Sequence, residues 1–252
     1  MDTASAEKKI RQNQDLKKAK LLKAFENNIQ ISNLNLPNKF ISFEEWELTK
    51  SNRLLYEISR KKNTYQRFPR GSIIKVDFGV NVGGEFSQQH FAITLNKKDN
   101  MYNNTLTVIP LTSKPHKNTL NLGSLIVDAY LQKLQKEIDD LQKKYSEIDI
   151  ENCEWNPNYK KEIKSIETIL KYYKKTRNNL SYARIDQIRT ISKLNIIPPM
   201  NQYDVVGKIK CSDDIMKQID NEIIAKFTSV DFPQFELWRK EHDQNPWKNW
   251  LF

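Results

Sequence analysis

The side chains best suited to chemistry lie at the ends of two expected strands. His90 begins the apolar segment 90–95, and Thr112 and Ser113 end the segment 106–113. An imidazole exchanges protons near neutral pH, and hydroxyl groups donate hydrogen bonds to phosphate oxygens. If the two segments are neighbouring strands, these groups form a compact site that could handle a phosphate.

A charged loop follows Ser113 and adds candidates to this site. Lys114, His116 and Lys117 could bind phosphate, and His116 could also complete an acid–base pair with His90. The alternative is an exposed loop whose charges are simply solvated.

Other polar residues flank the same region. Arg70 could contact the backbone of a polyanion or form a structural salt bridge, and Lys75 is a further candidate for phosphate binding. Gly83 and Gly84, followed by Glu85, predict a tight or mobile loop. A phosphate-binding nest would need a helix start after the glycines, which the sequence lacks.

The charge of the chain favours a polyanionic partner. The 252 residues contain 41 Lys and Arg against 31 Asp and Glu, a net charge of +10. Lysine and arginine bind a phosphate backbone with release of counterions. Lysine-rich helices that only keep the protein soluble would give the same number.

Composition also bounds the compartment and the cofactors. Cys153 and Cys211 lie far apart and match no metal-ligand spacing, so we expect neither a disulfide nor a metal, and no cofactor. No apolar run reaches the ~20 residues that span a bilayer, and the polar N-terminus does not resemble a secretion signal. We therefore expect a cytoplasmic protein without a membrane partner.

The apolar spacing predicts a mixed set of elements. Helices are expected over 6–30 and from Ser42, which with Glu45 forms a capping box, to about Ser59. Leu22, Phe25 and Ile29 of the first helix recur at helical spacing, and the predicted contacts of the second are Trp46, Leu54, Leu55 and Ile58. Alternating or apolar runs predict strands over 74–78, 91–96, 106–111, 124–127, 180–185 and 187–191.

Residues 129–178 break the strand pattern. Apolar residues recur there every three or four positions, which predicts an antiparallel helical hairpin inserted between strands. A last helix begins after Ser212, with Met216, Ile219, Ile223 and Phe227 on one face. The aromatic residues of the tail after 227 either dock on the body or on a second copy, or stack on bases.

These elements divide the chain into four parts and predict an α+β fold. The parts are a helical extension at 1–68, a small β-barrel built from 69–128 and 180–227, the inserted hairpin at 129–179, and an aromatic tail at 228–252.

The β-region resembles the PemK/MazF family of toxin endoribonucleases. The similarity covers about 70–128 and 180–227, and four segments carry it in the family's order: Arg70–Phe78, Val82-Gly83-Gly84-Glu85 with the strand after His90, Val108–Ser113, and Asp186–Ile191. The helix after Ser212 matches the family's C-terminal helix in order.

The resemblance implies a function as well as an SH3-like barrel. It implies a toxin of a toxin–antitoxin system that inhibits growth by cleaving single-stranded RNA, without metal, through attack of the ribose 2′-hydroxyl. It implies a homodimer and a cognate antitoxin, with a protein antitoxin favoured over an RNA one. On this resemblance, the residues expected to catalyse the reaction are His90, Thr112 and Ser113. Those expected to bind RNA are Arg70, Lys75, Lys114, His116 and Lys117.

One departure from the family concerns the catalytic pair. Thr112 is present, but His90 stands where the family has an arginine. An arginine offers a fixed charge, whereas a histidine can transfer a proton. The site is therefore either shifted towards proton transfer or weakened. Two other functions fit: a non-catalytic RNA- or protein-binding module, or a toxin directed at a topoisomerase.

Overall fold

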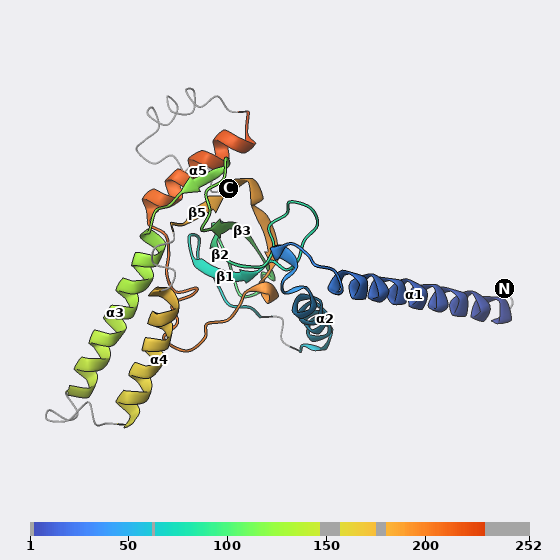
Figure 1. Ribbon diagram of the computed structural model, residues 1–252, viewed down its shortest axis with the longest axis horizontal. Coiled ribbons are helices and arrows are strands. Elements are labelled where there is room, and N and C mark those ends of the chain that lie inside the picture. The colour runs from blue at the N-terminus through green and yellow to red at the C-terminus, as the bar shows by residue number, and fades with distance from the viewer. Residues whose placement is uncertain (1–2, 62–63, 147–156, 175–179, 230–252) are drawn as a thin grey trace. The chain divides into compact units, whose positions relative to one another are not determined.

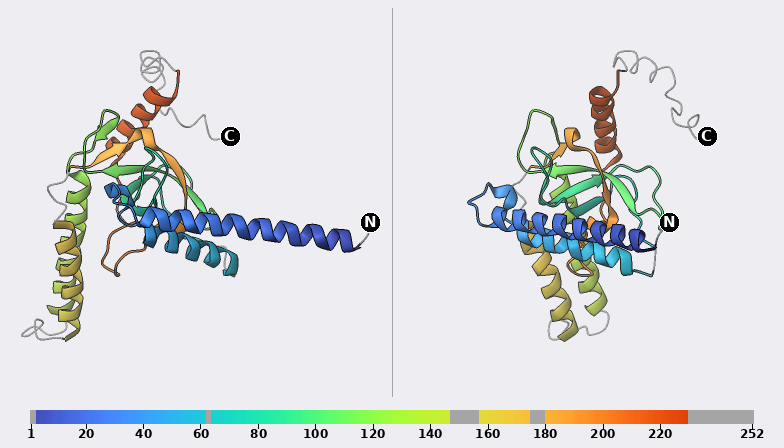
Figure 2. Two further views of the ribbon diagram at one scale, coloured as in Figure 1. Left: turned by 45° about the vertical axis from the view of Figure 1, so that its right-hand side comes forward. Right: turned by 90° about the vertical axis from the view of Figure 1, so that its right-hand side faces the viewer.

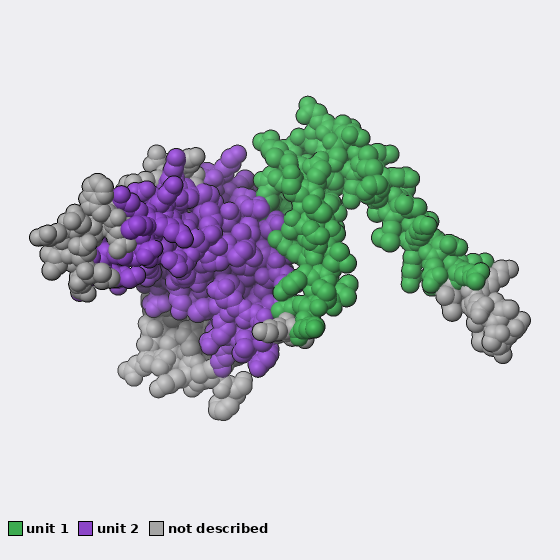
Figure 3. Space-filling view, turned by 90° about the horizontal axis from the view of Figure 1, so that it is seen from below, with its two compact units in different colours: residues 1–61, 79–88 green, residues 62–78, 89–252 purple. Residues whose placement is uncertain are grey.

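A computed structural model describes residues 3–61, 64–146, 157–174 and 180–229. The chain forms two compact units, one of residues 1–61 and 79–88 and the other of residues 62–78 and 89–252 (Figure 3). The predicted aromatic tail lies, from residue 230 on, outside the described residues.

The larger unit contains an antiparallel sheet of six strands and three helices (Figure 1). The strands are β1 (Ile73–Asp77), β2 (Gln89–Thr94), β3 (Thr105–Thr112), β4 (Thr119–Asn121), β5 (Tyr182–Arg184) and β6 (Arg189–Ser192). The helices are α3 (Leu125–Ser146), α4 (Pro157–Lys174) and α5 (Asp213–Phe227).

The strands follow the order β1-β2-β3-β5-β4, and β6 also pairs with β3. The first half of β3 pairs with β6 and its last two residues pair with β5. The α+β class is thus confirmed. The sheet is open, with β1 and β4 at its ends, so the expected closure into a barrel is not seen among the described strands.

One face of the sheet packs against the helices. Successive side chains of a strand point to opposite faces, so every second residue enters this core. The buried strand residues of this core are Ile73, Ile93, Ile109 and Leu111. They pack with buried residues of all three helices: Tyr130, Leu134, Ile166, Ile169, Ile215 and Ile219.

The helical hairpin forms as its spacing predicts. Leu134, Leu141 and Tyr145 of α3 are buried and belong to the same core as Ile166 of α4. Ile148 and Tyr173, which belong to the same three-and-four spacing, lie outside the described side chains.

Two local predictions in this unit are wrong. The fourth strand is Thr119–Asn121 rather than 124–127. It stops before Gly123, which has φ +62, and Ser124 then hydrogen-bonds Asp128 (2.8 Å between Oγ and Oδ2) as the helix begins. At the C-terminus, Ser212 caps α5 as predicted, but Phe227 is exposed rather than packed.

The smaller unit consists of α1 (Thr3–Ser32), α2 (Phe43–Ser59) and the loop 79–88 (Figure 2). Lys39 Nζ donates to the carbonyls of Gly83 at 2.9 Å and Asn81 at 3.3 Å, and so ties the loop to the turn between the helices. Ser42 is the N-cap of α2, but its side chain makes no capping bond, so the predicted capping box is wrong.

The apolar contacts predicted for these two helices are largely wrong. Trp46 is half-buried, but the other predicted contacts are exposed: Leu22, Phe25, Ile29, Leu54, Leu55 and Ile58. The helices form as the spacing predicts, yet most of the apolar side chains named for them are exposed among the described residues.

Candidate functional site

The sheet places His90 on the second strand beside Val76 of the first. On the other side of β2, Ala92 pairs with Pro110 of β3. His90 and Thr112 each lie two residues beyond that pair, in opposite chain directions. Antiparallel register therefore puts both on the same face and in the same row, although the described ladder ends at Ala92 and Pro110.

A hydrogen bond places the His90 ring at β3. The ring bonds the backbone of Leu111. Because this bond raises the pKa of the histidine, it favours the protonated ring, so the ring donates and the carbonyl accepts. That carbonyl belongs to the peptide that joins Leu111 to Thr112. The imidazole thus contacts the residue directly before the hydroxyl.

Burial controls the charge of His90. It lowers the pKa of the imidazole below its ordinary 6.5, and the bond to Leu111 offsets this only in part. At neutral pH the ring is therefore uncharged, with one nitrogen protonated and the other carrying a lone pair. A ring in this state can accept a proton.

Thr112 is half-buried, and its hydroxyl oxygen accepts a bond from the backbone N–H of Lys114 at 3.2 Å. The chain turns out of the sheet here, so Ser113, Lys114, His116 and Lys117 all lie on the exposed loop between β3 and β4. The loop is fixed at its far end, where the Thr119 hydroxyl donates to the His116 carbonyl at 2.8 Å. The predicted loop residues thus follow Thr112 directly in the chain, and the Lys114 N–H contacts its hydroxyl.

Two residues that the sequence did not single out share the row with Thr112. Tyr182 of β5 pairs with Thr112, and Asn121 of β4 pairs with Tyr182. Directly opposed side chains project to one face with Cβ atoms about 5 Å apart. Tyr182 lies in a predicted strand, but the sequence does not say that a strand beyond the hairpin pairs with β3.

The structure places the other predicted binding residues elsewhere. Arg70 bonds the Leu95 carbonyl and forms a salt bridge with Asp220 of α5, at the opposite end of β2 from His90. Lys75 points to the helix-covered face, where its Nζ contacts the Tyr172 hydroxyl of α4 at 3.2 Å.

Gly83, Gly84 and Glu85 lie on the exposed loop of the smaller unit. A Cβ on Gly83 or Gly84 would meet no heavy atom within 4 Å, so neither glycine is required for a close contact in this structure.

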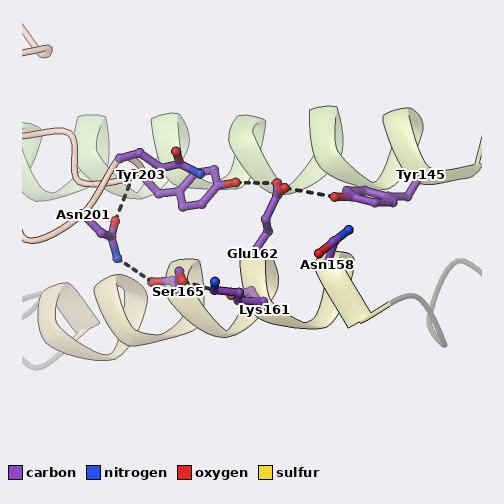
Figure 4. A pocket seen from close by; sticks show the side chains of 8 residues that line it. Tyr145, Asn158, Lys161, Glu162, Ser165, Asn201 and Tyr203 are labelled. Carbon is purple, nitrogen blue, oxygen red and sulfur yellow. Dashed lines mark hydrogen bonds between the residues drawn. The ribbon is translucent and has the colours of Figure 1, made fainter.

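A polar pocket of about 460 Å³ lies between α3, α4 and the segment 201–203 (Figure 4). Glu162 accepts hydrogen bonds from the hydroxyls of Tyr145 at 2.9 Å and Tyr203 at 2.5 Å. The bond from Tyr203 lowers the pKa of Glu162, while burial and the nearby carboxylate raise the pKa of Tyr203 to about 12. These groups satisfy one another and join three segments, so the cluster is primarily a structural one.

Among the residues that the structure describes, no group of three or more His, Cys, Asp or Glu could hold a metal ion. No helix in the described ranges is long and apolar enough to cross a membrane. Comparison of the chain with protein-family models and with curated proteins found no match.

Proposed function

We propose that this chain is an RNA-cleaving toxin of the PemK/MazF type, with His90 and Thr112 at its catalytic centre. The observation that supports this is the register of β2 and β3, which puts His90 and Thr112 in one row beyond the Ala92–Pro110 pair; the bond of the His90 ring to the Leu111 backbone agrees with it. An uncharged imidazole and a hydroxyl on one face of two neighbouring strands are suited to act on the same phosphodiester.

In the proposed reaction, His90 accepts the proton of a ribose 2′-hydroxyl. The 2′ oxygen attacks the adjacent phosphorus, while Thr112 and Ser113 donate hydrogen bonds to the developing charge on the phosphate oxygens. The bond to the 5′ oxygen breaks, and that oxygen takes up a proton, for which His116 on the neighbouring loop is the candidate donor. The products are a 2′,3′-cyclic phosphate and a 5′-hydroxyl, and no metal enters the scheme.

We propose that the open sheet corresponds to the SH3-like barrel of the family. Two isolated bridges, Ser72 with Lys210 and Val76 with Ile196, bring the chain after β6 back to β1. Cytoplasmic location and a cognate protein antitoxin belong to the same proposal.

A second function, RNA binding without cleavage, is favoured by the histidine in place of an arginine. A half-buried, uncharged ring stabilises a phosphorane less than a guanidinium does. The third possibility, a toxin directed at a topoisomerase, would rest on the aromatic tail, whose residues from 230 on lie outside the described part of the chain.

The test uses purified full-length protein, end-labelled single-stranded RNA and EDTA. We expect fragments with a 2′,3′-cyclic phosphate and a 5′-hydroxyl, and no cleavage at a position that carries a 2′-deoxyribose. His90→Ala and Thr112→Val should each lower the rate by about 100-fold or more. Thr105→Val, at the exposed start of the same strand, is the matched control. Binding with no cleavage over hours would select the second function instead.

A further inference from the structure

The smaller unit exposes two apolar helix faces. On α1, the exposed fractions are 54% for Leu22, 63% for Phe25 and 46% for Ile29. On α2 they are 63% for Leu48, 65% for Leu55 and 83% for Ile58. Two such faces on one small unit indicate a binding surface rather than scattered exposure.

Both faces have the spacing of a coiled-coil seam. Leu22, Phe25 and Ile29 are three and four residues apart. On α2 the residues at intervals of three, four and three are Leu48, Ser51, Leu55 and Ile58. Side chains with this spacing pack best against another helix.

The two helices carry opposite charge. α1 has seven basic and three acidic residues, a formal charge of +4, whereas α2 has two basic and four acidic residues, a formal charge of −2. Two α1 helices would repel each other, and α1 and α2 attract. The partner that offers both faces with the required charges is a second copy of the chain.

The two seams also match residue by residue when the helices are parallel and offset by 26 positions. Leu22 then faces Leu48, Ile29 faces Leu55, and the large Phe25 faces the small Ser51. One turn earlier, the seam position of α1 is Lys18 and that of α2 is Glu44, which bear opposite charges.

We propose that the chain forms a symmetric homodimer in which α1 of each copy packs in parallel on α2 of the other. The chain reverses direction between α1 and α2 (Figure 2). A two-fold axis between the copies therefore forms both α1–α2 pairs at once. The dimer covers the apolar faces that are exposed on the smaller unit, and it does not depend on the proposed RNA cleavage.

The test measures the mass of the full-length protein by analytical ultracentrifugation between about 1 and 100 μM, the range of moderate protein affinities. The wild type should be a dimer. Phe25→Glu and Leu55→Glu should each raise the dissociation constant about 100-fold or more, because symmetry counts each substitution twice. Tyr102→Glu, on a 74% exposed residue of the larger unit, is the matched control. Circular dichroism checks that all variants keep their helix content.

Mixing identifies which helices pair. A Phe25→Glu chain and a Leu55→Glu chain together retain one intact α1–α2 pair, so the mixture should dimerise more tightly than either variant alone. Lys18→Glu and Glu44→Lys should each weaken the dimer, and the double variant should recover.

A monomeric wild type would overturn the proposal. So would a dimer that resists both substitutions, a dimer that only the α1 substitution weakens, or a mixture no tighter than its parts. Co-sedimentation of a monomeric chain with vesicles containing phosphatidylserine would assign the surface to lipid instead.

Discussion

At the scale of single residues, the protonation of His90 sets the expected pH dependence. Burial lowers the pKa of the imidazole from 6.5. A general base works in its unprotonated form, so kcat/KM for RNA cleavage should fall on acidification with a midpoint below pH 6.5. His116→Asn should keep this midpoint, and His90→Asn should lose it. A midpoint above 6.5 would contradict the assignment of His90 as a buried base.

Lys193 and Asp99 form a buried ion pair, which we expect to contribute strongly to the stability of the fold. Lys193 Nζ lies 2.8 Å from Asp99 Oδ2, and both side chains are almost fully buried. Burial pushes the pKa of Asp99 up, but hydrogen bonds from Lys193 and from the Phe68 N–H outweigh it, so the pKa lies below its usual 3.8.

Asp99→Asn should therefore lower the free energy of unfolding by about 3–5 kcal/mol, because it leaves the Lys193 ammonium buried without its counter-charge. The same pair should contribute its full stability above pH 3.8 and lose it as the pH falls through the lowered pKa of Asp99. Urea unfolding of the variant, with the exposed Asp213→Asn as control, measures the first effect. A loss below 1 kcal/mol would contradict this account of the pair.

The sequence predicts single residues well where strand alternation decides their position. His90 and Thr112 follow from alternation and from the order of two adjacent strands. The position of Lys75 cannot be predicted in this way, because its contact is Tyr172 of the inserted hairpin, 97 positions away. For Arg70 the sequence leaves two roles open, because its salt bridge depends on how α5 returns to the sheet.

At the scale of elements, Gly79 lets the start of the loop 79–88, which follows β1, pack closely against Trp46 of α2. Its φ is +76, and a Cβ there would lie 2.2 Å from the Trp46 ring. Gly79→Ala should thus destabilise the smaller unit by more than the roughly 1 kcal/mol that a left-handed alanine costs. Gly83→Ala is the matched control, because Gly83 has φ +59 and open space around it. The fluorescence of Trp46, in chains whose other four tryptophans are replaced by phenylalanine, reports the difference during urea unfolding, and equal effects of the two substitutions would contradict it.

Element types were easier to predict than their ends and their partners. The hairpin helices follow from a repeated three-and-four spacing, whereas β4 was placed too late because Gly123 and Ser124 start a helix instead. The faces of α1 and α2 were expected to be covered within the chain. Spacing predicts that a face is apolar, but not which molecule covers it.

At the scale of the whole molecule, the net charge of +10 predicts salt-sensitive RNA binding. The logarithm of the binding constant should fall linearly with the logarithm of the salt concentration, by about 0.7 per phosphate contacted. Replacing Lys114 and Lys117 together with Ala should reduce that slope by about 1.4. Fluorescence anisotropy with a 2′-deoxy-substituted strand measures this. Replacing Lys160 and Lys161 of α4 together with Ala is the matched control. An unchanged slope on replacing Lys114 and Lys117 would exclude the loop after β3 from the RNA interface.

The central claim is that His90 and Thr112 act on the same phosphodiester. A double-mutant cycle on kcat/KM for RNA cleavage, using wild type, His90→Ala, Thr112→Val and the double variant, tests it most directly. Because both groups stabilise one transition state, the double variant should be barely slower than the slower single variant. Independent losses that multiply, or single variants as fast as wild type, would contradict the claim.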